Sequence, residues 1–384
     1  MQCLVFAARI PVVLWLVLVA CAASAADYVP PRGAWEEIAP AEAGFDPARL
    51  AEAVAWARAQ AVTEPADLAQ VITAHFGPLE PDFRLYGPTR PRAGDSGMVV
   101  RHGYVVARWG DVQRADMTFS VAKSYLSTIA ALALADGLIA DLHDPVARYV
   151  DDRRFAGEHN GAITWHHLLN QTSDWSGTLW GVPDWADRPE GEDPARWRDR
   201  PLHAPGSRFK YNDVRVNLLA WALLQVHRRP LPEVLRKRIM DPIGASTTWR
   251  WHGYGNSWVE LDGLRMQSVS GGGHFGGGLF ISTEDHARYG LLFLRRGNWG
   301  GRQLFPADWV DRLRRPTPAR PDYGYLWWLN TGRERIPAAP ATAYAAAGFG
   351  GNHIYVDEEH DLVIVLRWIP DLAPVVERVL GALE

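Results

Sequence analysis

The sequence has almost no cysteine. Cys3 and Cys21 are the only two among 384 residues, and both lie near the N-terminus. The rest of the chain therefore has no disulfide, no thiolate nucleophile and no cysteine metal site. It must be held together by core packing alone, and 384 residues are enough for one large domain or two smaller ones.

The sequence also lacks a strong charge of one sign. The net charge is −4 and the pI is about 6.4, so there is no basic field to attract nucleic acid. Lysine is nearly absent, because the basic charge is almost all arginine. The three lysines are Lys123, Lys210 and Lys237. A lysine inside a motif is therefore less easily explained as chance.

The N-terminus has an apolar run, residues 10–20, that is too short for a comfortable membrane span. Small residues follow it, which is typical of a signal peptide over residues 1–25 with an Ala23-x-Ala25 cleavage site. The alternative is a lipoprotein signal over residues 1–20, with Cys21 acylated as a lipid anchor. Both interpretations predict export, to the periplasm or to the outer membrane as a lipoprotein.

Secondary-structure signals divide the chain into three parts. Residues 98–107 and 353–366 each read as a β-hairpin, whereas residues 115–255 look mostly helical with long loops. We therefore expect an α+β fold, with one antiparallel sheet built from both ends of the chain and an all-helical lobe between them. The expected sheet lobe comprises residues 27–114 and 256–384, including a long loop at 61–92. Further strands are expected at 277–281 and 325–328, and a final helix from Pro374.

A Ser-x-x-Lys motif opens the helix expected after residue 120. Ser120 and Lys123 share one helix face, and unpaired N–H groups at a helix start favour a developing anion. A buried lysine one turn further on can handle a proton. This arrangement is typical of an activated nucleophile. The alternative is a serine N-cap beside a solvated lysine.

Further motifs follow in a fixed order and resemble one family. Residues 205–213 read P-G-S-R-F-K-Y-N-D and are similar to the P-G-x-x-F-x-Y-S-N segment of class C β-lactamases, family VIII carboxylesterases and 6-aminohexanoate-dimer hydrolases. The other matching segments are 118–120, 163–173, 277–285 and 323–328. Together they span roughly residues 95 to 370, so the chain resembles the β-lactamase-related serine hydrolases over most of its length.

The resemblance implies a β-lactamase/transpeptidase-like fold and a two-step acyl transfer without a cofactor. Ser120 would be the nucleophile, and Tyr211 would be the phenol that acts as general base and acid beside Lys123. The backbone N–H groups of Ser120 and of Phe349, which follows Gly348, would form the oxyanion hole.

Two positions depart from the family pattern. Asp213 stands where the family has asparagine, and an anion there would keep Lys123 protonated. Lys123 would then be a fixed cation while Tyr211 transfers the proton; alternatively, Asp213 binds an ammonium group of the substrate. The third family motif, at residues 346–352, has no cation. This argues against β-lactamase or D-peptidase activity and favours esters or uncharged amides.

Several other residues are weaker candidates. His274 lies in a glycine-rich segment, residues 271–278, that lacks the Gly-Lys-Ser/Thr ending of a phosphate loop. We expect this segment to be a flexible rim whose backbone lies near the substrate. Trp175 and Trp180 are expected to line the pocket for the acyl or leaving group. His166 and His167 lack the spacing of zinc proteases, so no metal is assigned.

The sequence therefore predicts an exported serine hydrolase acting on a small ester or amide substrate. A hypothesis of a different class is a catalytically inactive module that binds cell-wall or glycan fragments through its tryptophans. The intact Ser120, Lys123 and Tyr211 argue against that alternative. The sequence does not name the substrate.

Overall fold

The structure is a computed structural model and describes residues 28–384. The signal segment predicted at residues 1–25, with Cys21, lies outside the described residues. Among the residues that are described, no helix is both long enough and apolar enough to cross a membrane.

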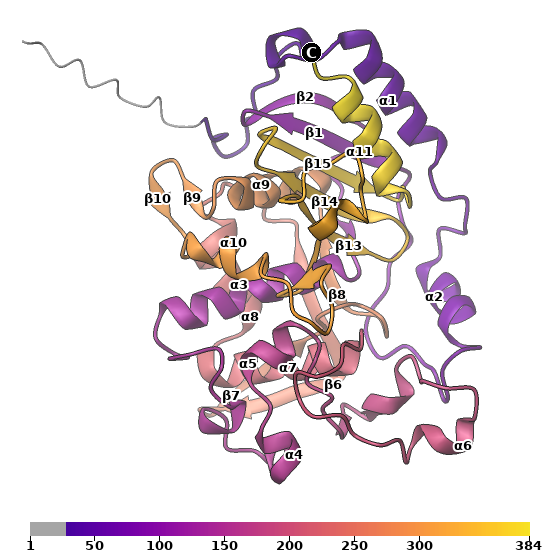
Figure 1. The fold of residues 1–384 in the computed structure, drawn as a ribbon, viewed down its shortest axis with the longest axis vertical. Helices are drawn as coiled ribbons and strands as arrows, with labels where there is room; N and C mark the ends of the chain where they lie inside the picture. The colour runs from indigo at the N-terminus through magenta and orange to yellow at the C-terminus, as the bar shows by residue number, and fades with distance from the viewer. Residues whose placement is uncertain (1–27) are drawn as a thin grey trace, which may run out of the picture.

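The larger sheet joins the two ends of the chain (Figure 1). Its seven strands are all antiparallel, in the order β11-β12-β13-β14-β15-β1-β2. The hairpins expected at 98–107 and 353–366 are confirmed as β1–β2 and β14–β15. The strands are β1 Ser96–Arg101, β2 Tyr104–Trp109, β11 Tyr323–Gly324, β12 Trp327–Leu329, β13 Tyr344–Gly348, β14 Asn352–Asp357 and β15 Leu362–Arg367.

The alternation of side chains along β15 shows why this sheet needs helices on both faces. Leu362, Ile364 and Leu366 belong to the core that contains α1 and α11, whereas Val363 and Val365 belong to the core that contains α3 and α9. Figure 1 shows α1 and α11 side by side, although they come from opposite ends of the chain. These helices are α1 Pro47–Ala59, α3 Val121–Ala135, α9 Thr283–Leu294 and α11 Leu372–Gly381.

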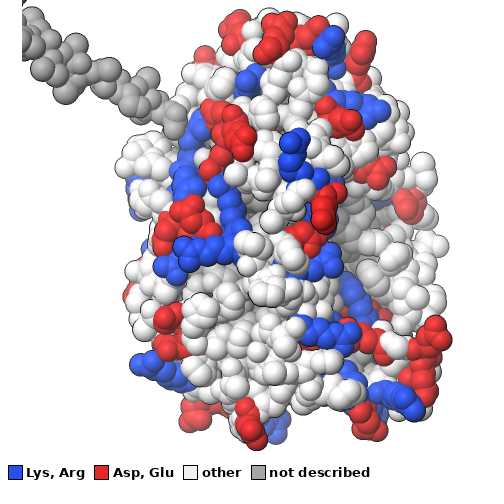
Figure 2. Space-filling view, viewed as in Figure 1, with Lys and Arg blue, Asp and Glu red and all other residues white. Residues whose placement is uncertain are grey.

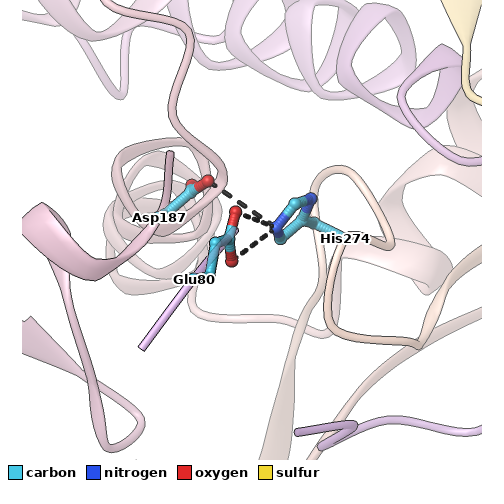
Figure 3. A group of neighbouring side chains, drawn as sticks. All are labelled: Glu80, Asp187 and His274. Atoms are coloured by element: carbon cyan, nitrogen blue, oxygen red, sulfur yellow. Dashed lines mark hydrogen bonds and ion pairs between the residues drawn. The ribbon is translucent and has the colours of Figure 1, made fainter. Parts of the chain in front are cut away.

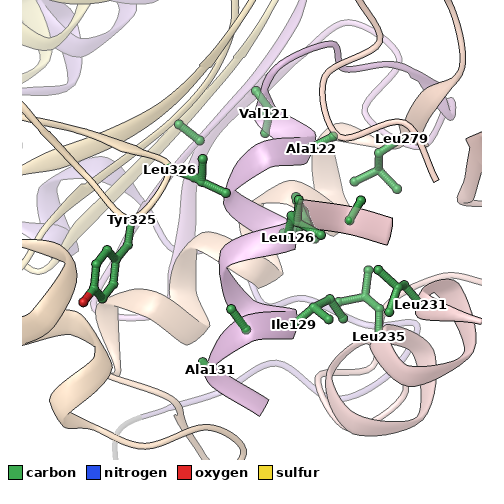
Figure 4. Packing of buried hydrophobic residues seen from close by; sticks show 14 of the residues in the cluster. Val121, Ala122, Leu126, Ile129, Ala131, Leu231, Leu235, Leu279, Tyr325 and Leu326 are labelled. Atoms are coloured by element: carbon green, nitrogen blue, oxygen red, sulfur yellow. The ribbon is translucent and has the colours of Figure 1, made fainter. Parts of the chain in front are cut away.

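Helix α3 runs through the centre of the molecule (Figure 4). Every residue from Val121 to Ala133 is buried, so the helix is enclosed on all sides and exposes no face to solvent. Leu126 and Ile129 pack toward Leu231 and Leu235 of α8. The remaining helices are α2 Leu68–Phe76, α4 Glu158–Gly161, α5 Trp165–Leu169, α6 Pro194–Trp197, α7 Asp213–His227, α8 Leu231–Leu235 and α10 Asp308–Leu313.

A second antiparallel sheet has the order β3-β8-β6-β7. It corrects two expectations: the strand at 277–281 joins this sheet and not the larger one, and the lobe boundary drawn at residue 255 falls inside β6. Its strands are β3 Asp116–Met117, β6 Arg250–Leu261, β7 Leu264–Val269 and β8 Gly278–Ile281. The described chain also has two small ribbons, with strands β4 Thr178–Leu179, β5 Val182–Pro183, β9 Asn298–Trp299 and β10 Arg302–Gln303.

Two local expectations are also wrong. The segment 61–92 is not a plain loop, because it contains α2, whose first turn is capped by the Asp67 carboxylate. The segment 325–328 is not one strand, because Tyr325 and Leu326 form a turn with φ of 42° and 68° between β11 and β12. Basic and acidic side chains are interspersed on the face drawn in Figure 2.

Candidate active site

Ser120 lies at the first turn of α3 with its hydroxyl free of any capping role. It is the N-cap residue, yet its side chain accepts no hydrogen bond from the helix backbone. The preceding Phe119 has φ of 49°, a left-handed conformation that is costly for a bulky residue. Instead of capping, Ser120 Oγ accepts a hydrogen bond from Lys123 Nζ at 2.8 Å. The interpretation as a serine cap beside a solvated lysine is therefore wrong.

Lys123 is buried, with 1 % of its side chain exposed. One helical turn separates it from Ser120, so both side chains leave the same face of α3. Its second contact is an ion pair of 2.8 Å with Asp213 Oδ1. The ammonium group therefore bridges the Ser120 hydroxyl and a buried carboxylate.

Asp213 is the first residue of α7 and follows the N-cap residue Asn212. Burial alone would raise its pKa, but Lys123, Arg188 and His274 outweigh burial and hold the pKa well below the usual carboxyl range. Its Oδ2 accepts from Arg188 at 2.9 Å. Because both oxygens are occupied and the side chain is 1 % exposed, the hypothesis that Asp213 binds a substrate ammonium group is not supported.

Tyr211 lies against this pair with its ring and not with its hydroxyl. The Lys123 ammonium is 4.7 Å from the ring centroid, and the Arg188 guanidinium is 5.2 Å from it. The ring also stacks on Trp328, with centroids 5.8 Å apart. In the described part of the chain the Tyr211 hydroxyl forms no hydrogen bond, so its catalytic role stays a prediction.

The glycine-rich segment passes directly over the ion pair. A Cβ added to Gly272 would lie 1.8 Å from Asp213 Oδ1 and 2.2 Å from Lys123 Nζ. Only a glycine lets the backbone approach this closely. The segment expected to be a flexible rim therefore forms a wall of the site.

Gly348 lies at the end of β13, next to Ser120. A Cβ there would lie 3.1 Å from the Ser120 amide nitrogen and 2.3 Å from the Thr118 carbonyl oxygen. The following Phe349 begins the turn between β13 and β14. Within the described chain the amides of Ser120 and Phe349 have no backbone acceptor, as the predicted oxyanion hole requires.

Buried polar contacts hold this turn in place. Asn352 donates to the Phe349 carbonyl oxygen at 2.7 Å and accepts from Arg367 at 2.6 Å. Arg367 also donates to the carbonyl oxygens of Met117 at 3.0 Å and Ile281 at 2.8 Å, which ties the two sheets together. Burial lowers the pKa of Arg367 to about 10. The turn and the start of α3 therefore share one fixed support.

Arg188 is a charged neighbour that the sequence did not reveal. It bonds Asp213 and also Asp187 Oδ1 at 2.6 Å, and its side chain is one-third exposed. Burial lowers its pKa, but the nearby carboxylates and Tyr211 raise it more, so it stays above the ordinary value. Arg188 lies in an irregular segment that no motif covers, so no sequence pattern points to it.

His274 takes part in the same network, as a buried residue and not in a flexible rim (Figure 3). Its Nδ1 lies 3.0 Å from Arg188, and its Nε2 lies 2.8 Å from Glu80 Oε1. A guanidinium can only donate, so Nδ1 accepts and the ring proton is on Nε2, facing Glu80. Glu80, like Arg188, lies outside every sequence motif.

Glu80, Asp187 and His274 have the composition of a metal site, and their donor atoms lie within 4.8 Å of one another. The guanidinium of Arg188 already supplies a cation to two of them. A metal would also need the Nε2 lone pair of His274, which carries the proton in this arrangement. The geometry therefore fits a hydrogen-bonded charge cluster better than a metal centre.

The two tryptophans proposed for the pocket do not contact the site residues. Trp175 is buried at 1 % exposure and donates to the Arg154 carbonyl oxygen at 2.7 Å, as a core residue does. Trp180 lies in a turn with φ of 53°, and its carbonyl accepts from Asn256 at 2.7 Å. The tryptophan beside Tyr211 is Trp328 instead. Nearness in sequence to the turn at Thr172 and Ser173 was a misleading guide.

Comparison with known proteins identifies the family and the fold. The sequence model of the beta-lactamase family matches residues 84–367, which is most of the chain. The chain belongs to the beta-lactamase family. This family of serine hydrolases is the one that the ordered motifs predicted, and the β-lactamase/transpeptidase-like α+β fold is confirmed.

Solved structures of beta-lactamase-fold proteins are similar over most of the chain. A penicillin-binding protein homolog from Caulobacter crescentus is 16 % identical, with a TM-score of 0.56 over 84 % of this chain and 99 % of that one. A family VIII carboxylesterase is 15 % identical, with a TM-score of 0.55 over 84 % and 97 %. At these identities the likeness shows the fold alone.

A curated relative from Salmonella enteritidis PT4 is named "Putative D-alanyl-D-alanine carboxypeptidase". It is 24 % identical over 198 residues, which is 43 % of this chain. The match spans about half of that relative, 46 % of its length. Membership of the beta-lactamase family is therefore much firmer than any individual activity.

Proposed function

We propose that this protein is an exported serine hydrolase that cleaves a carboxylic ester or an uncharged amide through an acyl-enzyme on Ser120. The observation that carries the proposal is the 2.8 Å contact between Lys123 Nζ and Ser120 Oγ. A lysine in contact with a serine hydroxyl, at a helix start with free amides nearby, is what an activated nucleophile needs.

The ammonium of Lys123 must first release a proton to solvent. The resulting neutral amine then accepts the Ser120 proton while Oγ attacks the substrate carbonyl carbon. The amides of Ser120 and Phe349 stabilise the resulting oxyanion. The proton then passes to the leaving oxygen or nitrogen, with Tyr211 as the adjacent phenol, and the carbon–leaving-group bond breaks. Water hydrolyses the acyl-enzyme in a second step of the same kind.

This order of proton transfers differs from the one expected from the sequence. There Lys123 was a fixed cation and Tyr211 took the proton. Because Lys123 Nζ lies 2.8 Å from Ser120 Oγ and the Tyr211 hydroxyl has no such contact in the described chain, we assign the first transfer to Lys123 and the second to Tyr211. General acid–base help of this kind is typically worth about 10² to 10⁴ in rate.

An apolar acyl group fits the surroundings of Phe349. A cavity of about 220 Å³ adjoins this residue; its walls include the apolar Leu68, Val71 and Trp368 and also Glu64, His75 and Arg92. The third family motif itself has no cation that would pair with a substrate carboxylate. The name of the Salmonella relative suggests D-peptides and that of the carboxylesterase suggests esters. The absence of a cation at the third motif favours the ester.

The test incubates the mature protein with a short-chain p-nitrophenyl ester and searches for an acylated Ser120 peptide by mass spectrometry. We expect turnover and a Ser120 adduct in the wild type and neither in Ser120→Ala. Ser207→Ala is the matched control, because Ser207 is exposed and lies in the loop that precedes Tyr211. Equal background rates in all three proteins would reject the hydrolase and favour the inactive binding module.

Export rests on the sequence alone. We propose that the N-terminal segment directs secretion, either by cleavage after Ala25 or by acylation of Cys21. The mass of the N-terminal peptide from expressed protein distinguishes the two: a free N-terminus at Ala26 indicates cleavage, and a lipid-modified Cys21 indicates an anchor. An intact Met1 would contradict both.

A further inference from the structure

Two cations share the single buried carboxylate of Asp213. Lys123 is bound to Oδ1 at 2.8 Å and Arg188 to Oδ2 at 2.9 Å. The side chain of Asp213 is only 1 % exposed, so water does not compete for either oxygen. We propose that Arg188 is a positioning residue that draws the charge of Asp213 away from Lys123 and so favours the neutral amine that can accept the Ser120 proton. The inference rests on the proposed function and specifies how the same site is tuned.

The physical reason is the opposed action of the two neighbours of Lys123. A buried carboxylate at 2.8 Å favours the charged ammonium and so opposes its use as a base. Arg188 acts in the other direction, because it neutralises part of the carboxylate and also repels the ammonium directly. A site with Asp213 but without Arg188 would therefore hold the Lys123 proton more firmly.

Arg188 is fixed from several sides, which distinguishes it from a mobile surface arginine. Its backbone N–H donates to Glu80 Oε1 at 3.1 Å, and the residue has a left-handed φ of 50°. Its guanidinium contacts Asp187 at 2.6 Å and His274 at 3.0 Å. A left-handed backbone is uncommon for arginine and persists only where surrounding contacts hold it.

The charged groups around Asp213 come from four segments of the chain. Lys123 comes from α3, Glu80 from the loop after α2, Asp187 and Arg188 from the segment before α6, and His274 from the glycine-rich segment. The face of the Tyr211 ring lies against both cations, Lys123 and Arg188.

Besides burial, the charge of Asp213 also acts on two tyrosines, Tyr254 and Tyr323, and raises the pKa of each. Burial is the main cause of the raised pKa of each, so both stay neutral near pH 7. The balance that sets Lys123 is therefore made by Asp213 and Arg188, with Glu80, Asp187 and His274 holding Arg188 in place.

The low lysine content allows a direct test that does not depend on turnover. Lysine labelled with 15N gives only three side-chain signals, and Lys210→Arg and Lys237→Arg variants identify that of Lys123. We expect the pH at which Lys123 loses its proton to rise by about one unit in Arg188→Met, because one nearby cation is removed. Arg188→Gln keeps an N–H donor for Asp213 but has no charge, so it should give a similar rise. It serves as the second variant if Arg188→Met does not fold.

Arg200→Met is the matched control. Arg200 is an arginine with 14 % of its side chain exposed that follows α6, and it pairs with Asp174 and Asp184 rather than with Asp213. In Arg200→Met the pH at which Lys123 loses its proton should be the same as in the wild type. An unchanged or lowered midpoint in both Arg188 variants, or an equal rise in Arg200→Met, would overturn the inference.

The second readout is the pH–rate profile of ester hydrolysis, corrected with Ser120→Ala. In Arg188→Gln the acid limb should move to higher pH, with about a tenfold loss on that limb and near-normal rates at alkaline pH. Arg188→Lys, which keeps the cation, should recover most of the loss. A uniform loss at every pH would indicate a merely structural role and reject the inference. A wild type that forms no Ser120 adduct would instead reject the proposed function, while the Lys123 titration would still decide the role of Arg188.

Discussion

In the described part of the chain, helix α7 connects two of the buried ionic clusters. The site cluster consists of Glu80, Lys123, Asp187, Arg188, Asp213 and His274. The loop cluster consists of Asp174, Asp184, Arg200 and Arg215, in which Arg215 donates to Asp174 at 2.8 Å and to Asp184 at 3.0 Å. Asp213 and Arg215 are only two residues apart in α7, yet each belongs to a different cluster.

The two clusters have similar residues and similar burial, but their hydrogen-bond networks reach different groups. In the loop cluster the charged groups contact one another and backbone atoms, such as the Trp175 carbonyl oxygen that accepts from Arg215 at 3.2 Å. In the site cluster the chain of contacts ends on the Ser120 hydroxyl. Burial and charge therefore do not mark a functional site by themselves; the group at the end of the network does.

The largest effect on activity is expected for Lys123, the member of the site cluster that contacts Ser120. Lys123→Met removes the group in contact with Ser120 and leaves Asp213 paired with Arg188, so the fold should survive. We expect kcat/KM for ester hydrolysis to fall by about 10² to 10⁴. Near-UV circular dichroism should match the wild type, and activity within threefold of the wild type would refute the proposed role of Lys123.

The equivalent change in the loop cluster should affect stability and not chemistry. Arg215→Met leaves Asp174 and Asp184 with Arg200 as their only cation. Removing one partner of a buried ion pair typically costs about 3–5 kcal/mol. Urea unfolding should report this loss, while the pH–rate profile of the folded fraction keeps its shape. A shifted profile would mean that the two clusters are one.

Gly272→Ala tests how closely the site cluster is enclosed. The added methyl group would fall 1.8 Å from Asp213 Oδ1, so it must displace the ion pair or the segment. We expect at least a tenfold loss in kcat/KM, of the order found when a catalytic group is misplaced. Gly94→Ala is the control, because no atom lies within 4 Å of its added Cβ. Equal activity of the two variants would contradict the enclosed geometry.

Asp213→Asn is expected to have the smallest effect, and its sign is opposite to that of the Arg188 variants. Removing the anion should let Lys123 lose its proton at lower pH, so the acid limb of the profile moves down by about one unit. The folded-state pKa of Asp213 is lowered, so its contribution to stability is present above the usual carboxyl range and is lost as the pH falls. The variant should lose that part of the acid sensitivity. A profile that coincides with the wild type would exclude Asp213 from the tuning of Lys123.

Expectations that rested on local geometry agree with the structure. Ser120 and Lys123 come together because helical spacing alone brings i and i+3 to one face. Expectations that rested on nearness in sequence were wrong. Trp175 follows a family motif closely, yet it packs into the core, whereas Trp328 reaches Tyr211 from more than a hundred residues away.

The sequence by itself determined the family and the order of the motifs, because these depend on residue types at short spacings. It also determined that Ser120 and Lys123 meet, since one helical turn joins them. Only the tertiary structure decided that Arg188, Glu80 and His274 surround Asp213. They come from irregular segments without periodicity, and their positions depend on the packing of α2, α7 and the glycine-rich segment around a charge that no local pattern shows.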